Sequence, residues 1–255
     1  MKRLVSSFAI AFSMYSKIPM PKVEWSKENM RYAMCFFPLV GAVLGGVVYL
    51  WSSFSEVLAM SRVFNTIIVI LIPLLLTGGI HLDGFMDTTD ARSSYQPRER
   101  KLEILKDPNT GAFAVIACVS YFLLTFGFWY EVTPEVVPVV TIGFVLSRAF
   151  SGLAVVTFPL AKNSGLAATF SSEANKKLTR VVMICFILLA TCGMLLINWK
   201  LGVICLLGVI LLFIYYYLMS VKEFGGITGD LAGYFLQLCE LIIVICAVVG
   251  GKLCG

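Results

Sequence analysis

The sequence predicts an all-α fold, a polytopic bundle of transmembrane helices. Of its 255 residues, 59% are hydrophobic and only 14% are charged, whereas soluble domains usually carry about 25% charged residues. The hydrophobic residues form segments long enough to cross a bilayer, which takes roughly 20 residues in a helix. No long polar linker separates these segments. We therefore expect about seven spans in a single integral membrane domain that covers residues 1–255.

Each expected span is a mostly apolar segment of bilayer-crossing length. The segments cover residues 32–52, 63–82, 111–130, 134–158, 181–199, 201–219 and 231–250. A tight turn at Asn198-Trp199-Lys200 is expected between the fifth and the sixth. The stretch from Lys2 to Tyr15 is also apolar but lacks the small-residue cleavage pattern of a signal peptide. We expect it to be retained as an N-terminal interfacial or re-entrant segment.

The distribution of basic residues predicts the orientation. Sixteen of the 20 Lys and Arg residues lie before the first span or in the connections 83–110, 159–180 and 220–230, which share one side of the membrane. Cytoplasmic loops carry an excess of Lys and Arg. The N-terminus and these loops are therefore expected in the cytoplasm, with the protein in the cell (inner) membrane. The basic residues form no stripe with interleaved aromatics, which argues against nucleic acid as a partner.

A cluster of aspartates follows the second predicted span. Asp83, Asp87 and Asp90 are spaced so that they share one face of a helix. Three like charges on one face repel each other unless a cation neutralises them, and oxygen-only ligands suit Mg²⁺ or Mn²⁺ rather than zinc. Mg²⁺ is usually held by one or two carboxylates with substrate phosphate, which points to phosphate chemistry. The alternative is a solvated helix end whose acids pair with Arg92, Arg98 or Arg100.

A second motif repeats part of the first. Gly225-Gly226-Ile227-Thr228-Gly229-Asp230 matches Gly78-Gly79-Ile80-x-x-Asp83 in spacing and residue type. Both copies follow a span that runs toward the predicted cytoplasmic side, so they would bring Asp83 and Asp230 to the same depth. The two halves could then complete one metal site. Chance is the alternative in a chain with 21 glycines.

Other polar residues are candidates for catalysis or substrate binding, each with a structural alternative. His81 suits a general base or a phosphate contact, or a hydrogen-bonded structural histidine. Lys106 and Asn109 lie in a turn before the third span, which is either a phosphate-binding helix entry or a plain loop. Arg148 lies inside the fourth span, where a charge needs a partner or a polar cavity. It suits bidentate phosphate binding or an ion pair with Glu240.

Taken together, these motifs resemble the cobalamin synthase family, adenosylcobinamide-GDP ribazoletransferase, over nearly the whole chain. The stretch Gly-Gly-x-His-x-Asp-Gly-x-x-Asp-x-x-Asp at 78–90 is the most specific. The other matching segments are Phe37-Pro38-Leu39-Val40-Gly41, Lys106-Asp107, Gly111-Ala112-Phe113, Arg148 and Gly225-Gly226-Ile227-Thr228-Gly229-Asp230. They occur in the family's order.

The resemblance implies the assembly of the nucleotide loop of vitamin B12 by a Mg²⁺-dependent phosphotransferase. Adenosylcobinamide-GDP and α-ribazole, or its 5′-phosphate, would give adenosylcobalamin, or its 5′-phosphate, and GMP. The implied catalytic residues are His81, Asp83, Asp87 and Asp90. The implied metal ligands are Asp83, Asp87, Asp90 and Asp230. The implied substrate-binding residues are Arg92, Lys106, Asn109 and Arg148.

Two other functions fit part of the pattern. A CDP-alcohol phosphotransferase would also be a membrane enzyme with an aspartate–metal cluster, but the chain lacks that family's later aspartate pair. A cation-coupled transporter would place its acids at the bilayer midplane in broken helices, whereas these aspartates are expected at a membrane face. The lipid bilayer is an expected partner, and a homo-oligomeric state is left open.

Overall fold

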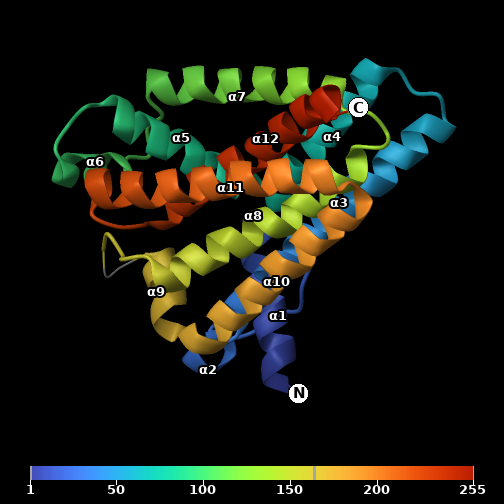
Figure 1. Ribbon diagram of the computed structural model, residues 1–255. Coiled ribbons are helices and arrows are strands. Elements are labelled where there is room, and N and C mark those ends of the chain that lie inside the picture. Colours follow the sequence, from blue (N-terminus) through green and yellow to red (C-terminus); the bar gives the residue numbers. More distant parts are fainter. Residues whose placement is uncertain (1, 163–164, 255) are drawn as a thin grey trace.

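The protein is a bundle of helices joined by short connections (Figure 1). The computed structural model describes residues 2–162 and 165–254. The helices are α1 (Lys2–Tyr15), α2 (Lys27–Met30), the 3-10 helix η1 (Ala33–Phe36), α3 (Phe37–Val57), α4 (Arg62–Thr77), α5 (Ile80–Ser93), α6 (Arg98–Ile104), α7 (Ala112–Glu131), α8 (Val137–Thr157), α9 (Leu166–Glu173), α10 (Lys176–Ile197), α11 (Trp199–Met219), the π-helix η2 (Ser220–Phe224) and α12 (Gly229–Cys254). The predicted all-α fold is confirmed.

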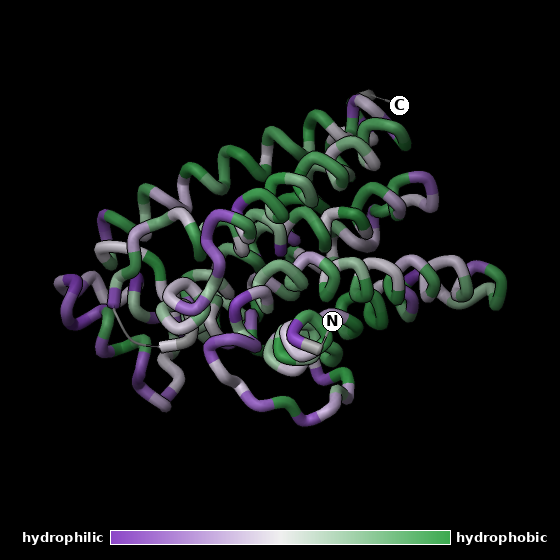
Figure 2. The backbone as a smooth tube through the Cα atoms, turned by 90° about the horizontal axis from the view of Figure 1, so that it is seen from below, coloured by the Kyte–Doolittle hydropathy of each residue, from purple (hydrophilic) through white to green (hydrophobic). Residues whose placement is uncertain are grey.

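The helices have the length and composition of membrane spans. Within the described residues, six are long and apolar enough to cross a bilayer, and the bent pair α4–α5 raises this to as many as seven. In Figure 2 the long helices are mostly hydrophobic, and the hydrophilic segments lie mainly in connections and at helix ends. The chain is therefore a multi-pass membrane protein. At 14 residues, α1 is too short to span, since a spanning helix needs about 17–25 residues.

The second predicted span, 63–82, is wrong as a continuous helix. The α4 helix ends at Thr77, α5 begins at Ile80, and the two axes differ in direction by 92°. Gly78 and Gly79 between them have φ angles of 65° and 77°, in the left-handed region. That region is readily adopted by glycine and rarely by other residues, so the Gly-Gly pair ends one helix and redirects the chain into the next.

The most enclosed span is α8, which lies among α3, α10 and α12 (Figure 1). The approach of α3 depends on Gly41 and Gly45, because a Cβ atom there would lie 2.2 Å from the carbonyl oxygen of Phe144 and 2.3 Å from that of Thr141, respectively. Small residues spaced four apart allow such close packing of membrane helices. This packing explains the glycine in the Phe37–Gly41 motif.

An ion pair joins α8 to α12 inside the bundle. The Arg148 guanidinium donates to the Glu240 carboxylate, and only 1% of the Arg148 side chain is exposed. The same guanidinium also donates to the Phe144 carbonyl and to the Ser147 hydroxyl. Of the two interpretations that the sequence offers for Arg148, the structure shows the pairing with Glu240.

The predicted turn between α10 and α11 is confirmed. Asn198 ends α10, and its side chain accepts a hydrogen bond from the backbone N–H of Leu201, at 3.2 Å, in the first turn of α11. Asparagine is a favoured residue at this position because its side chain satisfies a free N–H of the helix start. A single residue thus separates two long helices.

We predict that Arg148→Met destabilises the protein strongly, because it leaves the Glu240 carboxylate buried without its partner. Breaking a buried pair in this way costs about 3–5 kcal/mol. The double variant Arg148→Met/Glu240→Leu should recover most of that loss, since replacing both charges removes the unpaired group. Thermal unfolding of the purified protein in detergent measures both effects. A single variant that melts like the wild type would contradict this account.

Candidate active site

The three clustered aspartates lie on one helix. Asp83, Asp87 and Asp90 all belong to α5, at spacings that keep them on one face. The Asp87 carboxylate is close enough to those of Asp83, Asp90 and Asp230 for all three to repel it. The structure therefore brings together the four aspartates that the sequence suggested as metal ligands.

Glycines allow α12 to bring Asp230 to α5. A Cβ atom at Gly84 would lie 2.7 Å from the carbonyl oxygen of Asp230, and one at Gly233 would lie 2.9 Å from the carbonyl oxygen of His81. Neither position has room for a larger residue without a shift of the backbone. The crossing of the two helices is thus set by one glycine on each. The hydroxyl of Thr228 donates to the Asp230 carboxylate at 3.3 Å.

The repeated Gly-Gly-Ile motif has the same structural role in both places. Gly225 and Gly226 have φ angles of 73° and 147°, so this pair also ends a helix in a conformation that favours glycine. Ile227 then pairs with the segment before α9, where its N–H donates to the Pro159 carbonyl at 2.9 Å. The two copies start α5 and α12, which cross at the aspartates, as the repeat predicts.

Asp90 lies at the start of α7. A Cβ atom at Gly111, the residue that precedes α7, would lie 2.0 Å from one carboxylate oxygen of Asp90. The N-terminus of a helix carries partial positive charge and free N–H groups, which favour a carboxylate. Asp90 is thus placed against the N-terminus of a second helix, whereas Asp83 lies in the first turn of its own helix. The glycine in the Gly111-Ala112-Phe113 motif makes room for it.

The arginines near the cluster pair with glutamates instead. Arg92 contacts Glu223 at 3.1 Å and donates to the hydroxyl of Tyr234 at 2.8 Å. Lys101 contacts Glu223 at 2.7 Å, and Arg100 pairs with a neighbour on α6. Every ion pair within the described residues uses a glutamate, and none uses an aspartate. The structure therefore shows Arg92 and Arg100 paired with glutamates, and not with the aspartates as the alternative interpretation required.

Arg92 and Asn109, both expected to bind substrate, have protein partners. Arg92 is held by Glu223 and Tyr234 as described. The backbone N–H of Asn109 and its side-chain amide both donate to the Asp107 carboxylate, at 2.9 and 2.8 Å. These two hydrogen bonds hold the pKa of Asp107 below its usual range. They also fix the exposed turn that leads into α7.

Two lysines stand next to the aspartates. Lys162 donates to the Leu102 carbonyl at 2.7 Å and is close enough to both Lys106 and Asp230 to interact electrostatically with them. Partial burial, and then the neighbouring charge of Lys106, lower the pKa of the Lys162 ammonium. The sequence singled out Lys106, whereas Lys162 was only one of the basic residues counted in the connection 159–180. The available signal for Lys162 was its position just after the fourth predicted span, on the same side of the membrane as the aspartates.

His81 is buried beside the cluster. Its ring is 5% exposed and lies 6.1 Å from the ring centroid of Tyr15 and 6.0 Å from that of Phe37. Its Nε2 atom has no hydrogen-bond partner within the described part of the chain. Arg148, whose partner is Glu240, is near enough to interact electrostatically with His81 but does not line the adjoining cavities.

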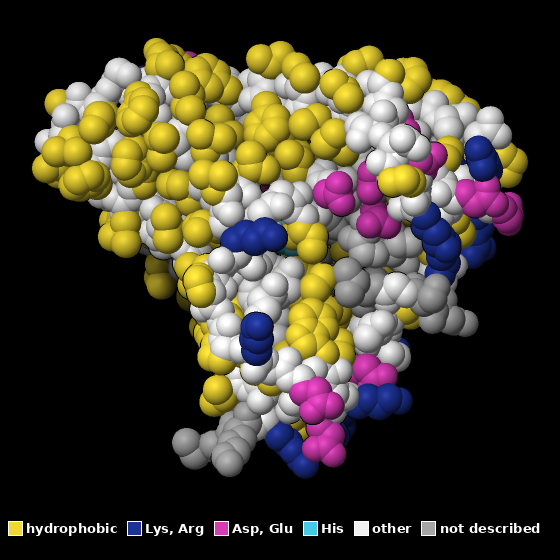
Figure 3. Space-filling model, turned by 180° about the vertical axis from the view of Figure 1, so that it is seen from behind, with side chains coloured by type: hydrophobic (Ala, Val, Ile, Leu, Met, Phe, Trp, Pro, Cys, Tyr) yellow, Lys and Arg dark blue, Asp and Glu magenta, His cyan; other side chains and the backbone are white. Residues whose placement is uncertain are grey.

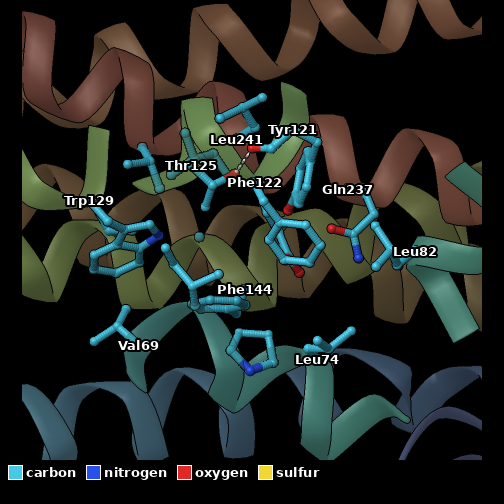
Figure 4. A pocket seen from close by; sticks show the side chains of 17 residues that line it. Val69, Leu74, Leu82, Tyr121, Phe122, Thr125, Trp129, Phe144, Gln237 and Leu241 are labelled. Atoms are coloured by element: carbon cyan, nitrogen blue, oxygen red, sulfur yellow. Dashed lines mark hydrogen bonds between the residues drawn. The ribbon is translucent and has the colours of Figure 1, made fainter. Parts of the chain in front are cut away.

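Two cavities adjoin the aspartates. One of about 280 Å³ is lined by His81, Asp83 and Asp230. The other, of about 510 Å³, shares Asp83 and extends along Lys17 and Gly78. A third pocket lies deeper among α4, α7, α8 and α12 (Figure 4), but its volume of about 40 Å³ has room for no more than a few water molecules. Substrate-sized space therefore occurs beside the aspartates and not inside the bundle.

Charged side chains are unevenly distributed over the surface. In Figure 3 acidic and basic side chains gather along the right side and at the lower end of the molecule, while a broad hydrophobic surface covers the upper left. No three His, Cys, Asp or Glu side chains in the described ranges are arranged to hold a metal ion by themselves. The carboxylates are nevertheless close to one another, and none of them forms an ion pair among the described residues, which fits a site where a cation shares ligands with a phosphate substrate.

Comparison with known proteins identifies the family. A family model described as cobalamin-5-phosphate synthase matches residues 7–248. A protein of Lachnoclostridium phytofermentans named adenosylcobinamide-GDP ribazoletransferase is 48% identical over 245 residues, which are 96% of this chain and 94% of that protein. Proteins with the same name are 34% identical in Clostridium botulinum strain Eklund 17B, over 95% of this chain and 96% of the relative, and 31% identical in Geobacillus sp. WCH70, over 94% of each.

No solved structure matches this chain. The sequence match runs through all the motifs described above, from the first long span to the last. The chain belongs to the cobalamin-5-phosphate synthase family.

Proposed function

We propose that this protein is an adenosylcobinamide-GDP ribazoletransferase that joins adenosylcobinamide-GDP to α-ribazole, or to α-ribazole 5′-phosphate. The products are adenosylcobalamin, or its 5′-phosphate, and GMP. The family membership supports this proposal. The observation that carries it is the group of four aspartates that form no ion pair among the described residues, with Lys162 near Asp230 and with cavities of about 280 and 510 Å³ beside them.

The reaction is the transfer of a phosphodiester centre. A ribose hydroxyl oxygen of α-ribazole forms a bond to the phosphorus that carries the cobinamide arm. The bond from that phosphorus to the bridging oxygen breaks, and GMP leaves with this oxygen. The hydroxyl proton passes to the imidazole of His81 or to the carboxylate of Asp83, two residues that line the cavity of about 280 Å³.

Mg²⁺ is the cofactor in this proposal. Asp83, Asp87, Asp90 and Asp230 would hold it together with the pyrophosphate oxygens. When bound, Mg²⁺ neutralises the negative charge that builds up on the leaving phosphate. The four carboxylates fit this role because their mutual repulsion favours a divalent cation, and because Mg²⁺ usually takes one or two carboxylates with substrate phosphate.

The lysines would bind the leaving phosphate. Lys106 and Lys162 lie side by side, and Lys162 also lies near Asp230. Two ammonium groups in contact repel each other, so an anion between them would relieve that repulsion. Both belong to connections that the charge distribution predicts on the cytoplasmic side of the inner membrane, where soluble nucleotides are found.

We predict that the purified protein releases GMP when adenosylcobinamide-GDP, α-ribazole and Mg²⁺ are all present. Omission of α-ribazole should abolish the release, because the hydroxyl nucleophile is then missing. Addition of a chelator should abolish it reversibly. Chromatographic detection of GMP and of the corrinoid product measures the reaction. The absence of both products from folded protein would refute the proposed function.

We also predict that Asp87→Ala lowers kcat/KM by about 100-fold or more, the loss typical when one electrostatic contact to the transition state is removed. Glu56→Ala is the control, because Glu56 is an exposed carboxylate of α3 that lines neither of the two cavities beside the aspartates. That variant should keep kcat/KM within about twofold of the wild-type value. Near-normal turnover of Asp87→Ala at saturating Mg²⁺ would remove Asp87 from the metal site.

A further inference from the structure

The cavity of about 280 Å³ reaches away from the aspartates into an aromatic part of the protein. Its walls come from α1, η1, α3, α5, α8, α9 and α12. The chemistry proposed above uses the edge formed by Asp83 and Asp230. The remaining walls need a separate explanation.

Those walls are aromatic. Tyr15, Phe37 and Phe170 line the cavity, and the ring of Tyr15 lies 4.2 Å from that of Phe37 and 5.8 Å from that of Phe170, centroid to centroid. They are joined by two methionines, Met14 and Met34. Aromatic and thioether side chains bind flat, apolar rings well, through stacking and through contacts of sulfur with ring edges.

His81 lies between the aromatic walls and the aspartates. Its ring contacts Tyr15 and Phe37, and its helix carries Asp83 two residues later. His81 lines the same cavity, and its Nε2 atom is buried without a hydrogen-bond partner among the residues that the structure describes. A buried polar atom without a partner is costly, so this position favours a ligand that brings a polar group there.

We propose that this cavity binds the base of the nucleoside substrate, with the flat heterocycle against Tyr15, Phe37 and Phe170. The sugar would then lie at His81, and the attacking hydroxyl would point to Asp83 and Asp230. This inference rests on the proposed function and adds to it the location of one substrate. A fused two-ring base such as benzimidazole has apolar faces and few polar edge atoms, which matches these walls.

The other parts of the two substrates fit the cavity less well. Guanine carries donors and acceptors along most of its edge, and buried polar groups of this kind need partners. Away from the aspartates and His81, the only side chains of the described lining that could supply them are the hydroxyls of Tyr15 and Ser151. A corrin ring with its side-chain amides is several times wider than a two-ring heterocycle. The larger, more open cavity along Lys17 and Gly78 is the better candidate for parts of the corrinoid substrate.

Ala232→Leu tests the proposal, because Ala232 lines the cavity from α12 and a leucine would fill part of it. We expect the KM for α-ribazole to rise about 10-fold or more, with the KM for adenosylcobinamide-GDP unchanged. Ala42→Leu is the matched control, since Ala42 is an exposed residue of α3, and it should change neither constant. A rise in the KM for adenosylcobinamide-GDP instead would overturn the assignment.

A binding measurement keeps the test independent of turnover and of any loss of stability in the variant. The ring of Trp25 contacts that of Phe170 edge-on at 6.4 Å, so its fluorescence should change when α-ribazole alone is titrated into the wild-type protein. Trp25→Phe should abolish the change. An enzyme that turns over while Trp25 does not respond would refute the cavity assignment and leave the proposed function standing. A Trp25 response without GMP release would refute the proposed function and leave the cavity assignment standing.

Discussion

The close crossing of α5 and α12 is the constraint on which the site depends. Gly84 and Gly233 let the two backbones meet, and any side chain larger than hydrogen at Gly84 would collide with the carbonyl oxygen of Asp230. The crossing converts two acidic segments, far apart in the sequence, into one cluster. It also places His81 and Asp230 on the same cavity. Close backbone approach through glycine is a common solution in membranes, where helices gain little from hydrophobic burial against each other.

Two basic residues near the cluster pair with a glutamate and not with the aspartates. Glu223 binds both Arg92 and Lys101, and the aromatic ring of Tyr234 lies against the same arginine. Arg92 follows Asp90 by two residues, so the two side chains do not share a face of α5. A cation site needs such an arrangement, since an internal ion pair would compete with the metal for the same oxygens.

Much of this site could be predicted from the sequence, for a physical reason. Aspartate spacing fixes a helix face, and the repeated Gly-Gly-Ile-x-x-Asp pattern fixes where the second helix starts, so Asp83 and Asp230 could be paired before the fold was known. The role of Arg148 could not be decided in the same way. A guanidinium inside a span needs a partner, but its choice between Glu240 and a phosphate depends on the rotation of α8 against α12.

The cavity walls lay beyond prediction from the sequence. Tyr15, Phe37 and Phe170 come from three separate helices and share no motif, and aromatic residues in apolar segments usually serve ordinary packing. The break after the second span was missed for a different reason. Hydropathy reports the composition of a segment and not its backbone conformation, so α4 and the start of α5 merged into one apolar stretch. The adjacent glycines at 78 and 79 were the available signal.

The 92° break between α4 and α5 lays the aspartates of α5 beside α12. A straight continuation of α4 would carry the 14 residues of α5 about 20 Å further along the same axis. Because α5 instead turns by 92° from α4, it packs beside α12. Asp83, Asp87 and Asp90 therefore lie on the helix that contacts the helix of Asp230, which is the arrangement that the proposed function needs to bring four carboxylates to one pyrophosphate.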